Sequence, residues 1–132
     1  MVAFPEVSVE GELVVVAVAG GSGAGRACAR RARWLLRRFH TMTTDDAKIL
    51  AASNDIYQTD DPAHLAYQRH NRARGRMSGQ IRLRIRYRTY ATPWFDYLMV
   101  SPDEMAMLAE SAGWRLAGTV HDNGPLYAGV LE

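Results

Sequence analysis

The stretch that decides the fold is Ile81-Arg-Leu-Arg-Ile-Arg-Tyr-Arg88, which continues after a short turn as Pro93-Trp-Phe-Asp-Tyr-Leu-Met-Val-Ser-Pro-Asp-Glu104. Its first half alternates apolar and charged residues with a period of two, which is typical of a half-buried strand. Its second half starts with β-favouring residues and ends in a capping box, in which Ser101 accepts from the amide of residue 104 and Glu104 reaches back. We therefore expect a β-hairpin over 80–100 and a helix over 102–112.

Helix and strand signals alternate on both sides of this segment. Upstream, the β-branched run 13–19 predicts a strand covered on both faces, and apolar residues with helical spacing predict a helix over 26–39. A buried strand is expected at 47–53. A helix over 62–74 follows, with Asp61 as N-cap and Gly75 just past its end. Downstream, strands at 115–121 and 126–131 flank a turn at 122–125. The order predicts one α/β domain over 1–132 with a mixed parallel and antiparallel sheet, and a disordered lead-in at 1–12.

Composition excludes several classes of protein. The chain has 132 residues, of which 48% are hydrophobic, so it is not a disordered protein. No apolar run reaches the length of about 18 residues that a membrane-spanning helix needs. Acidic residues and no basic segment stand at the start, which argues against a signal peptide. The single cysteine, Cys28, excludes an internal disulfide framework and indicates the cytoplasm.

The positive charge is concentrated in one segment. Between Pro62 and Phe95 there are eight arginines and no acidic residue, so the formal charge there is +8, against +2 for the whole chain. This segment either attracts an anionic partner or is a solvated face. The strand pattern places Tyr87 in the core and leaves only arginines on the exposed face. Because platforms for nucleic acids interleave aromatic residues with bases, this arrangement disfavours nucleic-acid binding.

Two further stretches are candidates for binding. A glycine-rich turn between a strand and a helix could hold a nucleoside cofactor; its glycines are Gly20, Gly21, Gly23 and Gly25. The alternative is a flexible turn, since Asp45 and Asp46 precede the next strand where a dinucleotide fold places an acid at its end. Asn54 and Asp55 follow a strand at the edge where open α/β sheets bind ligands, or they are plain turn residues.

The histidines and Cys28 have no metal-ligand spacing, and no nucleophile motif is present. We therefore expect no metal site, and the sequence identifies no catalytic residue.

Several segments, in their order along the chain, resemble the C-terminal half of bacterial class I S-adenosylmethionine-dependent methyltransferases. They are Asp45-Asp-Ala-Lys-Ile-Leu-Ala-Ala-Ser-Asn-Asp-Ile-Tyr57, Thr59-Asp-Asp-Pro-Ala-His-Leu-Ala-Tyr67, Asn71-Arg-Ala-Arg-Gly-Arg-Met77, Trp94 to Glu104, Ser111-Ala-Gly-Trp114 and Gly124 to Leu131. The resemblance covers residues 26–132 and implies part of a Rossmann-like sheet. Residues 13–19 would be its fourth strand, 47–53 its fifth, and 54–100 an insertion over the substrate side.

The resemblance implies methyl transfer from S-adenosylmethionine to an unknown small-molecule acceptor. Such enzymes hold the cofactor mainly with an N-terminal half that has no counterpart here before residue 13, so we expect a truncated enzyme. We expect the four glycines to border the cofactor, and Asn54, Asp55, Arg82 and Arg84 to contact the acceptor, which the arginines suggest is anionic. The alternative is a non-catalytic α/β module that associates through the sheet edge at 13–19 or the arginine stripe, as a homodimer or with a complementing chain. A nucleic-acid-binding domain is the less favoured third reading.

Overall fold

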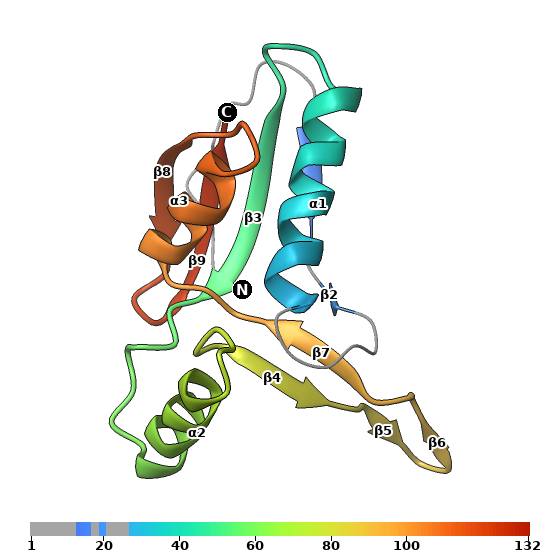
Figure 1. Cartoon of the computed structure of the whole chain (residues 1–132), viewed down its shortest axis with the longest axis vertical. Helices are drawn as coiled ribbons and strands as arrows, with labels where there is room; N and C mark the ends of the chain where they lie inside the picture. The colour runs from blue at the N-terminus through green and yellow to red at the C-terminus, as the bar shows by residue number, and fades with distance from the viewer. Residues whose placement is uncertain (1–12, 17–18, 21–26) are drawn as a thin grey trace.

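A four-stranded mixed sheet organises the chain (Figure 1). The computed structural model describes residues 13–16, 19–20 and 27–132. The strands of this sheet, in spatial order, are β1 (Leu13–Val16), β3 (Lys48–Asn54), β9 (Leu126–Leu131) and β8 (Leu116–His121). β1 runs parallel to β3, whereas β9 is antiparallel to both of its neighbours. The predicted mixed α/β sheet is therefore confirmed, with both C-terminal strands within one residue of their expected bounds.

A second, antiparallel sheet lies beside the first. Its strands are β2 (Ala19–Gly20), β7 (Phe95–Leu98) and β4 (Gln80–Leu83), with β7 in the middle. The residues predicted as one strand over 13–19 contribute to two sheets, because β1 pairs with β3 while β2 pairs with β7, and residues 17–18 lie outside the described residues. A run of β-branched residues indicates extended backbone but does not say which strand it will pair with.

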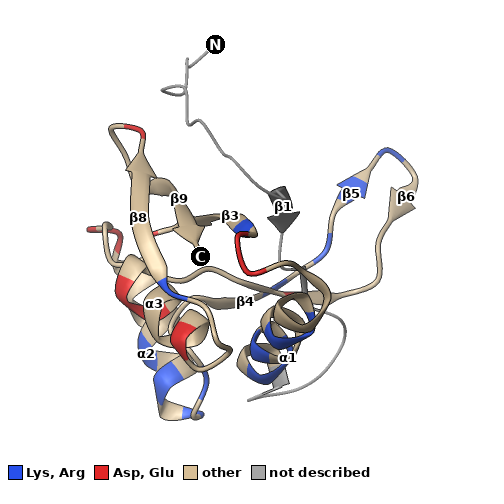
Figure 2. Ribbon diagram, turned by 90° about the horizontal axis from the view of Figure 1, so that it is seen from above, with Lys and Arg blue, Asp and Glu red and all other residues tan. Residues whose placement is uncertain are grey.

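Two helices cover the same face of the four-stranded sheet (Figure 2). They are α1 (Ala27–Met42) and α3 (Pro102–Glu110). The apolar stripe predicted for α1 is confirmed: Cys28, Ala32 and Leu36 are buried, and Leu35 and Phe39 pack against them. The indole of Trp114 is buried between the two helices and donates a hydrogen bond of 2.8 Å to the carbonyl of Leu36.

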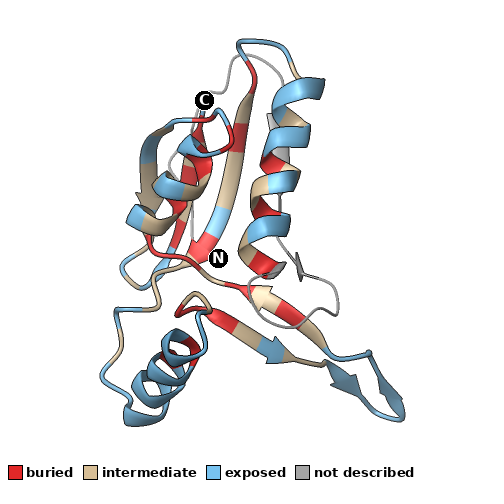
Figure 3. Cartoon of the chain, in the orientation of Figure 1, coloured by how far each residue is buried: buried red, intermediate tan, exposed pale blue. Residues whose placement is uncertain are grey.

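The core fills the space between these helices and the inner face of the sheet (Figure 3). Alternate residues of β3 and β9 face inward, as the period of a strand requires. The register places Ile49 opposite Leu131 and Ser53 opposite Tyr127, and all four are buried. The buried residues Met105 and Ala109 of α3 belong to the same core.

Both predicted helix caps form, but one of them only in part. α2 (Pro62–Ala73) begins where Asp61 accepts a hydrogen bond of 2.8 Å from the amide of Ala63, and Gly75 follows its end with a φ of 68°. α3 begins where Ser101 accepts from the amide of Glu104 at 3.2 Å. The reciprocal bond of the capping box was a wrong prediction, since the Glu104 carboxylate accepts from the Tyr57 hydroxyl instead.

The hairpin predicted over 80–100 forms, but its middle leaves the body of the protein. β4 pairs with β7, and beyond them β5 (Arg86–Tyr87) pairs only with β6 (Tyr90–Ala91). The prediction that Tyr87 is a core residue was wrong, because it is exposed, as is Ile85 on the same strand pattern. Alternation separates the two faces of a strand, but it does not establish that another element covers one of them.

The edge strand β8 is irregular. Its register against β9 shifts between Leu116 and Gly118, as in a β-bulge. Bulges twist the strand and interrupt its row of backbone donors and acceptors. β1 forms the opposite end of the four-stranded sheet that the described residues make.

Candidate functional site

A cavity of about 560 Å³ opens at the carboxyl end of β3. One wall is the end of β3 and the loop after it, from Asn54 to Thr59. The opposite wall is α2, with Tyr67 and Gln68. Met99 and Pro125, from after β7 and before β9, close the side. Open α/β sheets bind their ligands at this edge, so the cavity lies where the fold favours a ligand.

Asp55 fixes the backbone at the mouth of this cavity. Its amide donates to the carbonyl of Pro125 at 2.7 Å. Its Oδ1 accepts from the amide of Tyr57 at 3.2 Å, and its Oδ2 accepts from the side chain of Gln58 at 3.3 Å. Asp55 is therefore a turn residue that also lines the cavity, and its contact with a ligand stays a prediction.

Short hydrogen bonds hold the loop and α2 around the cavity. The side chain of Gln68 is buried and donates to the carbonyl of Ile56 at 2.7 Å. On the exposed side, Thr59 Oγ1 lies 3.0 Å from Nδ1 of His64. The side-chain Nδ2 of Asn71 donates to the carbonyls of Ser78 and Gln80, which ties α2 to the start of β4. The cavity is thus formed by the fold of this segment, and most of its lining is apolar.

Gly79 lines the cavity at a position where no side chain fits. A Cβ at this position would overlap the carbonyl of Met99 and lie 3.2 Å from Ile56 Cγ2. The carbonyl of Gly79 in turn accepts from the amide of Met99 at 3.0 Å. This close approach of two backbones requires a glycine.

A second cleft of about 720 Å³ lies between α1, α3 and β4. Three of its lining residues have a buried polar atom without a hydrogen-bond partner: Arg33 Nε, Gln80 Nε2 and Glu104 Oε2. Burial raises the pKa of the Glu104 carboxyl, and the nearby acids Asp55 and Asp103 raise it further, while the bond from Tyr57 lowers it. Unpartnered buried groups are costly, so this cleft is suited to polar molecules such as water.

The structure brings together half of the residues predicted to contact a substrate. Asn54 and Asp55 line the first cavity, where Nδ2 of Asn54 is 3.7 Å from the sulfur of Met99. Arg82 and Arg84 are not among the residues that line it. The guanidinium of Arg84 instead lies 5.1 Å from the ring centroid of Trp94, and only the backbone amide of Arg82 approaches the cavity, 3.4 Å from the Tyr67 hydroxyl.

The predicted glycine-rich cofactor loop falls mostly outside the described residues. Gly20 belongs to β2 and pairs with Asp96 of β7. Gly21, Gly23 and Gly25 lie outside the part of the chain that the structure describes. Their assignment to a cofactor therefore stays a prediction.

Two further observations bear on other classes of function. In the described residues, no three or more histidine, cysteine or acidic side chains lie together in a way that could hold a metal ion. Among the helices in the described part of the chain, none is long and apolar enough to cross a membrane.

Comparison with solved structures gives a likeness in fold. The structure is similar to that of a SAM-dependent methyltransferase from Bacteroides fragilis, which was crystallised in complex with S-adenosyl-L-homocysteine. The TM-score is 0.63 at 18% sequence identity, and the match covers 92% of this chain but 47% of the methyltransferase. No protein-family model and no curated protein matches the sequence. The chain therefore has a methyltransferase fold and spans about half the length of that enzyme.

Proposed function

We propose that the chain takes part in methyl transfer from S-adenosylmethionine and that the cavity at the end of β3 binds the methyl acceptor. The observation that carries this proposal is the likeness of nearly the whole chain to a methyltransferase that binds S-adenosyl-L-homocysteine. The position of the cavity supports it, since ligands of open α/β sheets bind beyond the carboxyl ends of the strands.

The chemistry of the cavity fits an acceptor better than it fits the cofactor. Among the described lining residues, Asp55 supplies the carboxylate, and both of its oxygens take part in holding the loop. The mainly apolar surface of the lining suits an acceptor better than the polar ribose of a nucleoside. We therefore assign the cofactor to other residues and derive no step through it. Methyl transfer by direct displacement needs positioning more than acid–base catalysis, so the absence of an obvious catalytic set among the lining residues is compatible with the proposal.

The acceptor that fits this cavity is a small and mainly apolar molecule. Most of the surface that the lining presents to the cavity is apolar, and Ile56, Ile81 and Met99 contribute to it. Asn54, His64 and Tyr67 supply a few polar atoms that could orient one functional group. An anionic acceptor, which the arginines of the hairpin suggested, finds no support here because neither Arg82 nor Arg84 lines the cavity.

The test of the proposed function is a calorimetric titration of the purified chain with S-adenosyl-L-homocysteine. Circular dichroism and thermal unfolding first establish that the protein is folded. Saturable one-to-one binding is expected. A folded protein that gives no binding heat contradicts methyl transfer by this chain as it stands.

The acceptor cavity has its own test with a fluorescent apolar probe, 8-anilinonaphthalene-1-sulfonate. Ala63→Trp places a large side chain in the lining, so it should lower the affinity for the probe. Ala66→Trp is the matched control, because Ala66 is an exposed residue of the same helix that is not among the lining residues. If both variants lose affinity equally, or if neither loses affinity, the assignment of the cavity is contradicted.

A second candidate function is a non-catalytic module that associates through the edge of its sheet, as a homodimer or with a complementing chain. The position of β1 at the end of the four-stranded sheet favours it. Gel filtration over a range of protein concentrations tests this alternative, and a constant monomeric size contradicts self-association.

A further inference from the structure

The outer part of the hairpin holds four large hydrophobic side chains in solvent. The exposed fractions are 59% for Ile85, 67% for Tyr87, 77% for Tyr90 and 49% for Trp94. The strands β5 and β6 project away from both sheets, and their whole length is exposed (Figures 1 and 3). Three aromatic rings on one small projecting element contribute little to a core, so their exposure calls for another explanation.

Arginine side chains alternate with these rings along the hairpin. The guanidinium of Arg84 lies 5.1 Å from the ring centroid of Trp94, and that of Arg88 lies 5.3 Å from the centroid of Tyr87. Such cation–π contacts hold a ring in place and keep a positive charge beside it. Trp94 is half exposed and lies beside the guanidinium of Arg84.

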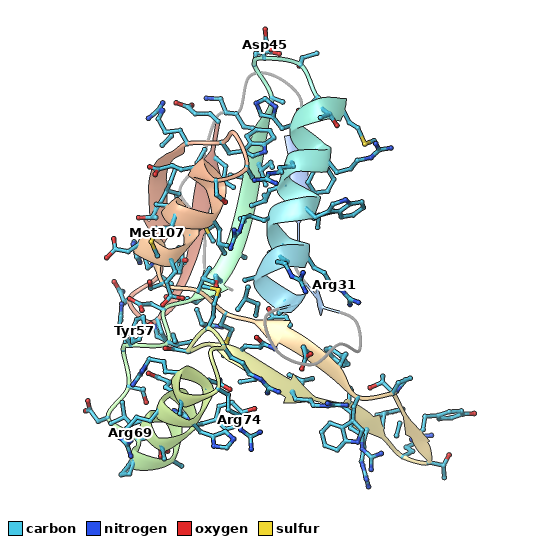
Figure 4. The ribbon with its side chains drawn as sticks, in the orientation of Figure 1. Arg31, Asp45, Tyr57, Arg69, Arg74 and Met107 are labelled. Atoms are coloured by element: carbon cyan, nitrogen blue, oxygen red, sulfur yellow. The ribbon has the colours of Figure 1, made fainter. Side chains whose placement is uncertain are left out.

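The charge around the hairpin has a single sign. The eight arginines between Pro62 and Phe95 are divided equally between α2 with the turn after it and the hairpin, and no acidic residue interrupts them. Basic residues colour α2 and β5 in Figure 2, and the side chains of Arg69 and Arg74 are labelled on and after α2 in Figure 4. The surface is therefore complementary to a polyanion.

We propose that the hairpin binds single-stranded nucleic acid. Bases would stack on Tyr87, Tyr90 and Trp94, while the hairpin arginines contact the phosphates. The sequence had argued against this function because Tyr87 was assigned to the core; its exposure supplies the aromatic residues that were missing. The inference goes beyond the proposed methyl transfer and does not depend on it.

Two other occupants fit this surface less well. A second copy of the same surface would bring eight arginines against eight, and the segment from Pro62 to Phe95 holds no acidic residue to offset them. A lipid bilayer would meet the tip of the hairpin first, and the residues between β5 and β6 are Arg88 and Thr89. The aromatic rings flank this polar tip, so they are placed to stack from the side and not to insert as a wedge.

The inference is tested by fluorescence anisotropy with labelled oligouridylate and oligothymidylate of about 12 nucleotides, which is within the site size of known single-strand-binding folds. Affinity should fall with salt, with a log–log slope of about −3 if the four hairpin arginines each contact a phosphate. No cofactor is needed, so a failure here is separate from a failure of the methyl-transfer proposal.

Variants separate stacking from simple charge attraction. Tyr90→Ala and Trp94→Ala should each weaken binding about fivefold or more, because stacking on one aromatic residue contributes at least that factor. Trp94→Phe should retain most of the affinity, since it keeps a ring under Arg84. Trp34→Ala is the matched control: Trp34 is 65% exposed on α1, among arginines, but lies outside the hairpin.

Several results would overturn the inference. If both alanine variants keep the wild-type affinity and this affinity still falls with salt, the binding is non-specific charge attraction. An equal loss of affinity in Trp34→Ala would show that the binding site is not confined to the hairpin. Binding to vesicles of anionic lipid but not to either oligonucleotide makes the partner a membrane, and self-association abolished by the alanine variants makes it a second copy of the chain.

Discussion

Tyr57, in the loop after β3, donates its hydroxyl hydrogen bond to Oε1 of Glu104 in the first turn of α3. The two residues are 47 positions apart in the chain. Tyr57 lies between the sheet and α2 in Figure 4. Since Glu104 lines the second cleft and the neighbours of Tyr57, Ile56 and Gln58, line the first, this bond joins the walls of the two cavities.

Tyr57→Phe should lower the free energy of unfolding by about 1–3 kcal/mol at neutral pH, because it leaves the Glu104 carboxylate without its donor while Oε2 already has none. Urea denaturation of the two proteins measures the difference. Tyr87→Phe is the control, since the exposed Tyr87 makes no such bond; a loss as large in that variant would show that the effect is not due to Glu104.

The size of this effect should depend on pH. Burial raises the folded-state pKa of Glu104, and the bond from Tyr57 opposes the rise, so Tyr57→Phe should raise that pKa further. A raised acid pKa means that stability is lost as pH rises through it. The difference in free energy of unfolding between wild type and Tyr57→Phe should therefore be largest above the Glu104 pKa of the variant. It should shrink as the pH falls below that pKa. A gap that is constant from neutral to acidic pH contradicts the role of the Glu104 charge.

Gly79→Ala should destabilise the protein by about 1–3 kcal/mol, because the added Cβ would overlap the carbonyl of Met99 and force two backbones apart. Thermal unfolding measures this loss. Gly118→Ala is the matched control, since nothing lies within 4 Å of a Cβ at that position. Gly79→Ala should also weaken binding of the apolar probe to the cavity that Gly79 lines. If Gly79→Ala leaves the stability unchanged, the close approach of the two backbones is contradicted.

Ser101→Ala should cost about 1 kcal/mol of stability, because the Ser101 hydroxyl satisfies the amide of Glu104 at the start of α3. The control is Ser111→Ala at the other end of the helix, where the serine is exposed and its effect should stay within about 0.5 kcal/mol. Chemical denaturation compares them, and equal effects would mean that the cap does not stabilise α3.

Cys28 should react slowly with a thiol reagent such as 5,5′-dithiobis(2-nitrobenzoate) while the protein is folded. The side chain is buried, and burial together with the charge of Asp96 raises the pKa of its thiol. Because the thiolate is the reactive form, the rate should be below that of free cysteine and should increase with pH. Reaction at the rate of free cysteine at neutral pH would contradict this burial.

The sequence predicted the helices and inner strands well because local rules determine them. The stripe of Cys28, Ala32 and Leu36, the Asp61 cap and the Ser101 cap each follow from a few neighbouring residues. The exposure of Tyr87 could not be predicted in this way, since it depends on whether another element covers the hairpin.

The candidate site could be predicted only in part for the same reason. Asn54 and Asp55 follow a strand directly, so the rule for open α/β sheets identifies them. Tyr67, Gln68, Met99 and Pro125 carry no local signal, because they reach the cavity from three other segments of the chain. Arg82 and Arg84 were assigned from charge alone, and charge does not determine which cavity a side chain enters.

The irregular register of β8 has a consequence for assembly. Its bulge hinders the addition of another strand on that side, whereas β1 ends the described sheet on the other. Copies that joined through the β1 edge would pair β1 with β1 about a two-fold axis, and this pairing would use up that edge in both copies. Growth of the four-stranded sheet through β1 therefore stops at a closed dimer, because the irregular edge of β8 is poorly suited to accept a further strand.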